Sequence, residues 1–138
     1  FGIDWIKLGP NGLHYRTNGS TNEDWYGYGE DLLAVADGVV VDAKDGIPDN
    51  LPDQPPVVTI NSQTAGGNFV LLDIGDGYFA YYAHLIPGSK TVQIGDRVSR
   101  GEVLGRLGNA GASTGPHLHF HLYSGRDPLF SEGVPYAF

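Results

Sequence analysis

The sequence contains no cysteine. This absence excludes a disulfide framework and every zinc motif built on thiolates, so any bound metal must be held by nitrogen and oxygen ligands. Basic residues are also few, with 8 Lys and Arg against 16 Asp and Glu and a net charge of -8. Such a balance argues against a nucleic-acid partner, which would require a basic patch.

Long apolar runs are missing as well. No stretch approaches the roughly 20 apolar residues that span a bilayer, so we expect no transmembrane segment in this chain. The start of the chain lacks the charged and apolar pattern of a signal peptide. Because the sequence begins with Phe1 rather than Met, we expect a processed product or a fragment of a longer protein.

Helical periodicity is scarce, and the 21 glycines would weaken helix interiors. Short apolar and aromatic runs instead alternate with Gly, Asp and Pro, which is typical of strands between turns. A length of 138 residues fits one domain that buries its own core. We therefore predict a single all-β domain over 1–138 with few, short helices. The expected strands are 32–36, 39–41, 57–60, 69–74, 78–83, 103–107 and 118–123.

Two segments interrupt this rhythm and are predicted to be loops. The segment 43–56 holds four of the nine prolines, which cannot donate to a sheet ladder. It either shapes specificity beside a cleft or is a passive surface excursion. The segment 8–30, which includes His14 and Asp24, has little periodicity and is expected to form a second loop over the same cleft.

The chemistry-bearing pattern lies near the end of the chain, where His117, His119 and His121 alternate with apolar residues directly after Gly115-Pro116. In a strand, residues at this spacing share one face. Three solvated histidines on an exposed strand would give the same pattern. The repeated choice of imidazole favours a metal site, with His121 either extending a polar groove or meeting solvent.

Several separated motifs resemble one known family. They are Ala-Val-Ala-Asp-Gly-Val-Val at 34–40, Gly-Asn-Phe-Val at 67–70, Tyr-Ala-His-Leu at 82–85, the segments 92–98 and 101–105, and Ser-Thr-Gly-Pro-His-Leu-His-Phe at 113–120. In this order they resemble the lysostaphin/LytM-type zinc endopeptidases. The resemblance implies an antiparallel β fold with a groove in which Zn²⁺ serves the cleavage of peptide bonds in bacterial peptidoglycan or in glycine-rich peptides. It also implies a site of action outside the cell or in the cell envelope or periplasm.

The resemblance assigns roles to individual residues. His119 matches the zinc ligand of the family's HxH motif, and His117 matches its catalytic partner beside the metal-bound water. His84 is similar to the family's other catalytic histidine. Imidazoles at His117 and His84 suit proton transfer, but the sequence does not divide that work between them. Tyr82 is expected to share the face of His84 by strand alternation, either to contact substrate or to pack against the sheet.

The family's HxxxD motif supplies the remaining ligands and is only partly visible. Asp4 is the preferred carboxylate, because the apolar residue before it and the aromatic residue after it suit a strand. The histidine four positions earlier would precede Phe1. Asp24 is the rival carboxylate, although Ser20 stands four positions before it. His14 is the alternative third ligand if it folds back from its loop.

Two other functions remain open from the sequence. One is a degenerate domain of the same fold that binds no metal and acts as a binding or regulatory module in the cell envelope. The other is a biotinyl or lipoyl carrier domain, which the segment 92–104 is similar to. A carrier needs a lysine at an exposed hairpin tip, and neither Lys44 nor Lys90 lies in such a motif.

Overall fold

The computed structural model describes residues 2–125 and 131–136. Regular structure in this part of the chain consists of nine strands and one three-residue 3₁₀ turn, η1 (Asn22–Asp24). The strands are β1 (Gly2–Trp5), β2 (Asp31–Leu33), β3 (Gly38–Lys44), β4 (Asn68–Gly75), β5 (Tyr78–Leu85), β6 (Arg97–Val98), β7 (Val103–Arg106), β8 (Leu118–Ser124) and β9 (Glu132–Gly133). The predicted all-β class is confirmed.

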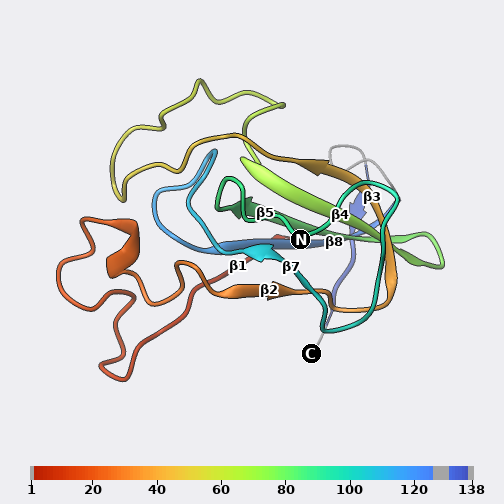
Figure 1. Cartoon of the computed structure of the whole chain (residues 1–138), viewed down its shortest axis with the longest axis horizontal. Helices are drawn as coiled ribbons and strands as arrows, with labels where there is room; N and C mark the ends of the chain where they lie inside the picture. The colour runs from red at the N-terminus through yellow and green to blue at the C-terminus, as the bar shows by residue number, and fades with distance from the viewer. Residues whose placement is uncertain (1, 126–130, 137–138) are drawn as a thin grey trace.

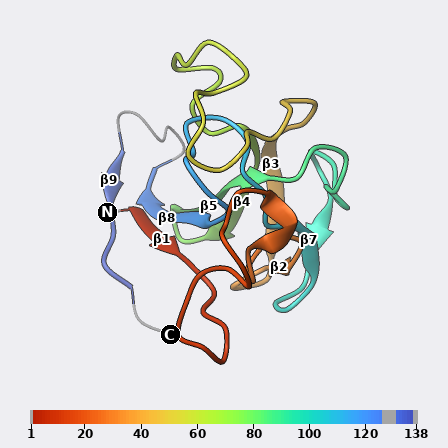
Figure 2. The same cartoon turned by 90° about the vertical axis from the view of Figure 1, so that its left-hand side faces the viewer.

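Seven strands form an antiparallel sheet in the order β1-β8-β5-β4-β3-β6, with β9 paired to β8 (Figure 1). Strands β2 and β7 pair separately as a small second sheet. β1 lies beside β8, as Figure 2 shows, although the two are far apart in the sequence. This pairing brings the start of the chain to the histidine-bearing strand.

The main core fills the space between the large sheet and the β2–β7 pair. Its side chains come from both layers, and among the most buried are Val40, Leu72, Tyr82, Leu104 and Phe120. Alternation along the central strands sends the intervening residues to the opposite face. A second, smaller cluster forms there around Leu71, Phe79 and Tyr123. The large sheet thus has one face in the core and one face that is available for a site.

The predicted strand at 57–60 is wrong. It follows Pro55-Pro56, and the Val57 backbone N–H donates to the side chain of Asn50 instead of entering a ladder. Val57 and Ile60 are 56% and 39% exposed, so their apolar character reflects no buried strand. The turn at Gly75-Asp76-Gly77 joins β4 to β5, and all three residues have positive φ.

Within residues 2–125 and 131–136, no helix is long and apolar enough to cross a membrane.

Candidate functional site

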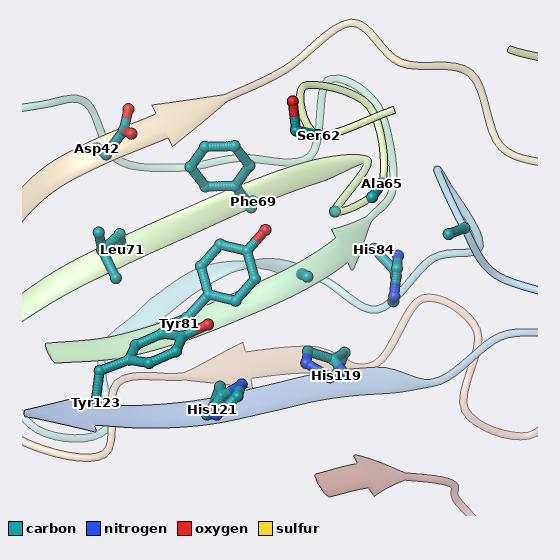
Figure 3. A pocket seen from close by; sticks show the side chains of 13 residues that line it. Asp42, Ser62, Ala65, Phe69, Leu71, Tyr81, His84, His119, His121 and Tyr123 are labelled. Atoms are coloured by element: carbon teal, nitrogen blue, oxygen red, sulfur yellow. The ribbon is translucent and has the colours of Figure 1, made fainter. Parts of the chain in front are cut away.

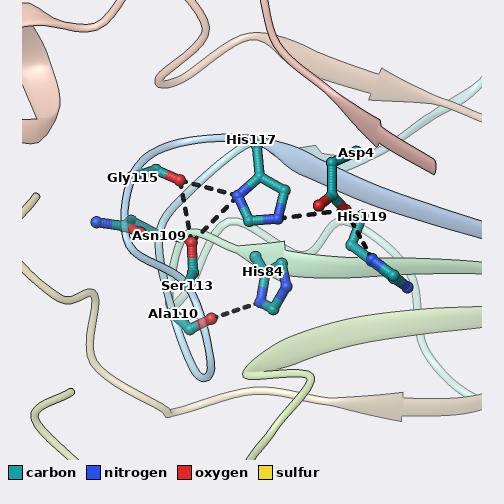
Figure 4. Close-up of polar contacts among 8 residues, drawn as sticks. All are labelled: Asp4, His84, Asn109, Ala110, Ser113, Gly115, His117 and His119. Atoms are coloured by element: carbon teal, nitrogen blue, oxygen red, sulfur yellow. Dashed lines mark hydrogen bonds and ion pairs between the residues drawn. The ribbon is translucent and has the colours of Figure 1, made fainter. Parts of the chain in front are cut away.

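Three histidines and one aspartate meet on the open face of the large sheet, as Figure 4 shows. The rings of His84 and His117 lie 4.7 Å apart between centroids, and those of His84 and His119 lie 6.0 Å apart. Asp4 completes the group from β1. The structure therefore brings together the four residues that the family resemblance assigned to metal binding and catalysis.

Strand pairing sets the position of Asp4. In the β1–β8 ladder Asp4 stands directly opposite His119, and the two side chains point to the same face. Asp4 Oδ1 lies 2.8 Å from His119 Nδ1 and 3.6 Å from His117 Nε2. The carboxylate thus faces both histidines of the HxH motif.

His84 reaches this face through an unusual backbone conformation. Its φ is +65°, which is uncommon for a residue other than glycine. Regular alternation would place His84 on the core side with Tyr82, but the left-handed conformation turns its ring toward the cavity instead. The backbone N–H of His84 donates to the Gly66 carbonyl at 2.9 Å, which holds this turn in place.

The expectation that Tyr82 shares the face of His84 is therefore wrong. Tyr82 is 1% exposed, packs edge-to-face on Phe120, and accepts the Val35 N–H at its hydroxyl. Tyr81 lies on the cavity side. Side chains alternate between the two faces of β5 as far as Ala83, and the positive φ of His84 breaks this alternation. No residue type nearby indicates the break.

Carbonyl groups fix the tautomers of two histidines. His84 Nδ1 lies 2.7 Å from the Ala110 oxygen, and His117 Nδ1 lies 2.9 Å from the Gly115 oxygen. Because a carbonyl oxygen only accepts hydrogen bonds, each Nδ1 must carry the proton, which leaves each Nε2 as an acceptor in the neutral ring. Burial, followed by the effect of the neighbouring His117, lowers the pKa of His84 to about 4. His84 is therefore a neutral base at neutral pH.

A cavity of about 520 Å³ extends from these histidines along the open face of the sheet (Figure 3). His121 lines it and stacks on Tyr123 with ring centroids 4.2 Å apart. Burial lowers the pKa of His121 to about 4. Of the two positions expected for His121, the structure therefore has the one in which it extends the groove. The other lining residues include Asp42, Phe69, Leu71 and Tyr81.

The donor atoms suit zinc in type. Asp4 Oδ1 and His119 Nδ1 provide a carboxylate oxygen and an imidazole nitrogen at close approach. Gly2 makes room for this arrangement, because a Cβ there would lie 2.7 Å from His119 Nε2. No group of three or more His, Asp or Glu residues in the described part of the chain is arranged to hold a metal ion. The described residues thus offer two ligands, one fewer than catalytic zinc usually takes from protein.

The two alternative ligands lie elsewhere. His14 is exposed and its ring lies 5.8 Å from that of Trp25. The Asp24 carboxylate accepts backbone N–H groups from Thr17, Asn18 and Gly19. The bond from Gly19 is the largest influence that lowers the pKa of Asp24. Asp24 therefore organises its own loop, and the geometry favours Asp4.

Comparisons with known proteins find peptidases among the relatives of this chain. The chain is 32% identical over 122 residues to the glycyl-glycine endopeptidase ALE-1 of Staphylococcus capitis. The aligned region covers 87% of the chain and 27% of the relative. The chain is also 41% identical over 66 residues to the peptidoglycan DD-endopeptidase ShyA of Vibrio cholerae. This aligned region covers 48% of the chain and 15% of the relative. The chain thus spans less than a third of the length of either relative.

Solved structures show the same fold. The antimicrobial peptidase lysostaphin from Staphylococcus simulans superposes with a TM-score of 0.56 at 26% identity, over 77% of this chain and 38% of that one. The model of peptidase family M23 matches residues 24–130, which include His84, His117 and His119, whereas Asp4 precedes the matched range. The chain belongs to peptidase family M23.

Proposed function

We propose that this chain is a zinc-dependent endopeptidase domain. The observation that carries the proposal is the convergence of Asp4 and His119 beside the imidazoles of His84 and His117, whose Nδ1 atoms each donate to a backbone carbonyl. Membership of a peptidase family supports the reaction class. The arrangement differs from a solvated histidine strand, because each ring has a defined partner and a defined tautomer.

Asp4 and His119 are the residues that would hold zinc. When bound, the ion supplies Lewis acidity toward a peptide carbonyl and makes a nucleophile available at neutral pH. The third protein ligand in this proposal is a histidine four positions before Asp4, as the family's HxxxD motif implies. His14 is not favoured, because it joins no group of acidic or histidine residues suited to a metal within the described residues.

His84 and His117 act on protons. The Nε2 atom of either ring accepts a proton from the attacking water and then returns one to the departing amine. A ring that has taken up the proton stabilises negative charge that develops on the substrate oxygen. Because burial lowers the pKa of His84, it releases that proton readily once the leaving group needs it.

The proposed substrates are peptides of bacterial peptidoglycan or glycine-rich peptides. The relatives named a peptidoglycan DD-endopeptidase and a glycyl-glycine endopeptidase support this class. The cavity beside His84 has Phe69 and Tyr81 on its wall, and this suits an extended peptide with small side chains. Action on peptidoglycan implies a location in the cell envelope or outside the cell.

A degenerate domain that binds peptidoglycan without cutting it is the second candidate. The observation that favours it is the groove lined by aromatic rings beside His84, which a domain that only binds peptides would use equally. The two candidates differ in one testable property, which is whether a histidine four positions before Asp4 creates a zinc site.

The experiment adds one histidine directly before Phe1 and compares it with an alanine added at the same place. Zinc content is measured by elemental analysis, and cleavage is measured on purified sacculi and on pentaglycine. The peptidase proposal expects about one zinc per chain and peptide cleavage only with the added histidine. Zinc-free protein in both cases would favour the degenerate module.

A further inference from the structure

One loop holds the rings of both His84 and His117. Its Ala110 carbonyl accepts the Nδ1–H of His84, and its Gly115 carbonyl accepts the Nδ1–H of His117. The Ser113 hydroxyl lies 3.2 Å from the same His117 nitrogen. Because both rings depend on this loop, a shift of segment 109–115 would move them together.

The loop is in turn held by Asn50. This side chain is 0% exposed, and its Nδ2 donates to the carbonyls of Gly111 at 2.8 Å and Ser113 at 3.0 Å. Its Oδ1 accepts the Val57 N–H at 3.0 Å. Asn50 belongs to the proline-rich segment 43–56, so this segment is fastened to the histidine-bearing loop.

Two more buried amides extend the network. Asn109 Nδ2 donates to Asn22 Oδ1 at 3.0 Å and to the Asn50 carbonyl at 3.1 Å. Asn109 Oδ1 accepts the Ser113 hydroxyl at 2.6 Å. A continuous chain of hydrogen bonds therefore runs from Asn22 through Asn109 and Ser113 to His117.

Such a network fixes geometry more strongly than apolar packing does. Each buried amide that lost its partner would bear the desolvation cost of an unsatisfied polar group, so the satisfied arrangement is favoured over its neighbours. None of these amides lines the cavity, so contact with substrate there does not account for them. Their hydrogen bonds end on the loop that carries the acceptors of both rings.

We propose that Asn50 is a positioning residue that, with Asn109 and Ser113, sets the orientation of both His84 and His117. The role of the two histidines rests on the proposed peptidase function. The proline-rich segment is then neither a passive excursion nor a substrate-contacting loop, but the anchor of the catalytic scaffold.

The test compares Asn50→Ala with Asn68→Ala. Asn68 is a matched control because it is 1% exposed, donates twice from Nδ2 to carbonyls, and accepts the Ile47 N–H at Oδ1. Both variants lose the same kind of buried hydrogen bonds. Both variants and the parent carry the histidine added before Phe1 and are measured under one metal condition. The two measured properties are the steady-state kinetics on a cleaved peptide and the ¹⁵N shifts of the histidine ring nitrogens.

Asn50→Ala is expected to lower kcat by about 10²-fold with KM within threefold, since small misplacements of catalytic groups cost about this much. The ring ¹⁵N shifts of both His84 and His117 are expected to change. Asn68→Ala is expected to lower the melting temperature comparably but to leave the His117 shifts and kcat near the parent values. Equal kcat and equal ring shifts in the two folded variants would overturn the proposal.

A milder pair covers the case in which Asn50→Ala does not fold. Ser113→Ala removes only the hydroxyl between Asn109 and His117, and Ser89→Ala removes a hydroxyl that accepts the Arg106 N–H. Ser113→Ala is expected to shift the His117 ring signals and leave those of His84 unchanged, whereas Ser89→Ala shifts neither. Unchanged His117 signals in Ser113→Ala would contradict the proposal. Because this readout needs no turnover, it decides the positioning role even if the protein cleaves no peptide.

Discussion

Asp4 and His119 stand opposite each other on neighbouring antiparallel strands, with Oδ1 and Nδ1 2.8 Å apart. The register of β1 against β8 creates this pair. A slip of one residue would turn Asp4 to the opposite face of the sheet and bring Ile3 or Trp5 toward the histidines. The proposed metal-binding half of the site therefore depends on the pairing of two segments from opposite ends of the chain.

Replacing the carboxylate tests this pair directly. Asp4→Asn keeps the shape but removes the charge, and it is expected to weaken zinc binding by more than the 10–100-fold typical of losing an outer partner. Asp24→Asn is the control, because the Asp24 carboxylate is occupied by the N–H groups of its own loop. Calorimetric zinc titration of both variants, each carrying the histidine added before Phe1, measures the two affinities. A greater loss in Asp24→Asn would reverse the assignment.

Gly2 is predicted to be intolerant of a side chain. A Cβ at this position would lie 2.5 Å from His119 Cε1 and 2.7 Å from Nε2, so Gly2→Ala must push the ring away from Asp4. In chains that carry the histidine added before Phe1, we expect at least a tenfold loss of zinc affinity, in line with the effect of disturbing a ligand's orientation. Gly27→Ala is the control, because its Cβ would meet only ordinary contacts at 3.5 Å and beyond. Equal zinc affinity in both variants would contradict the prediction.

Adjacent tyrosines are predicted to have separate effects. Tyr82→Phe leaves the part-buried Val35 N–H without its acceptor, so it should lower the free energy of unfolding by about 1 kcal/mol with little change in KM. Tyr81→Ala removes an aromatic wall of the cavity that lies 5.3 Å from the Phe69 ring, and it should raise KM by about tenfold. Denaturant titration and steady-state kinetics distinguish them. A KM effect confined to Tyr82→Phe would restore the original interpretation from sequence.

His84 is predicted to make the metal-free protein sensitive to acid. Its pKa is lowered from 6.5 to about 4 in the folded state, so the unfolded chain binds this proton at a higher pH than the folded one. Stability from this source is present above pH 6.5 and is lost as the pH falls toward 4, by ~3 kcal/mol in total. His84→Asn removes the titration, and Asn tolerates the positive φ.

Urea denaturation with a chelator at several pH values between 7 and 4 measures the effect. The difference between the parent and His84→Asn should grow steadily over this range. Parallel stability curves would mean that His84 does not titrate as its burial requires.

Much of the fold was predictable because strand alternation is a local property. The run from Leu118 to Tyr123 places imidazoles and apolar side chains on opposite faces, and β8 has this arrangement. The apolar run at 57–60 has the composition of a strand but forms none, because its Val57 N–H bonds to the side chain of Asn50 instead of to a neighbouring strand. Local pattern cannot reveal a partner that is supplied by a distant loop.

The site was predictable where motifs carry it and not where backbone geometry or long-range contacts decide. His84, His117, His119 and Asp4 were identified from spacing and family resemblance and lie together. Tyr81, rather than the expected Tyr82, shares the cavity with His84 because of the positive φ at His84. No neighbouring residue type indicates this backbone conformation. Asn50 gave no signal, since an asparagine in a proline-rich loop is ordinary turn chemistry.

The most direct test of the central claim is zinc content together with peptide cleavage in His119→Ala and His84→Ala, each carrying the histidine added before Phe1. His119 is predicted to hold the ion and His84 to transfer protons. His119→Ala should therefore lose both zinc and cleavage, whereas His84→Ala should keep most of its zinc and lose turnover. Full zinc in His119→Ala, or parental turnover in His84→Ala, would contradict the account.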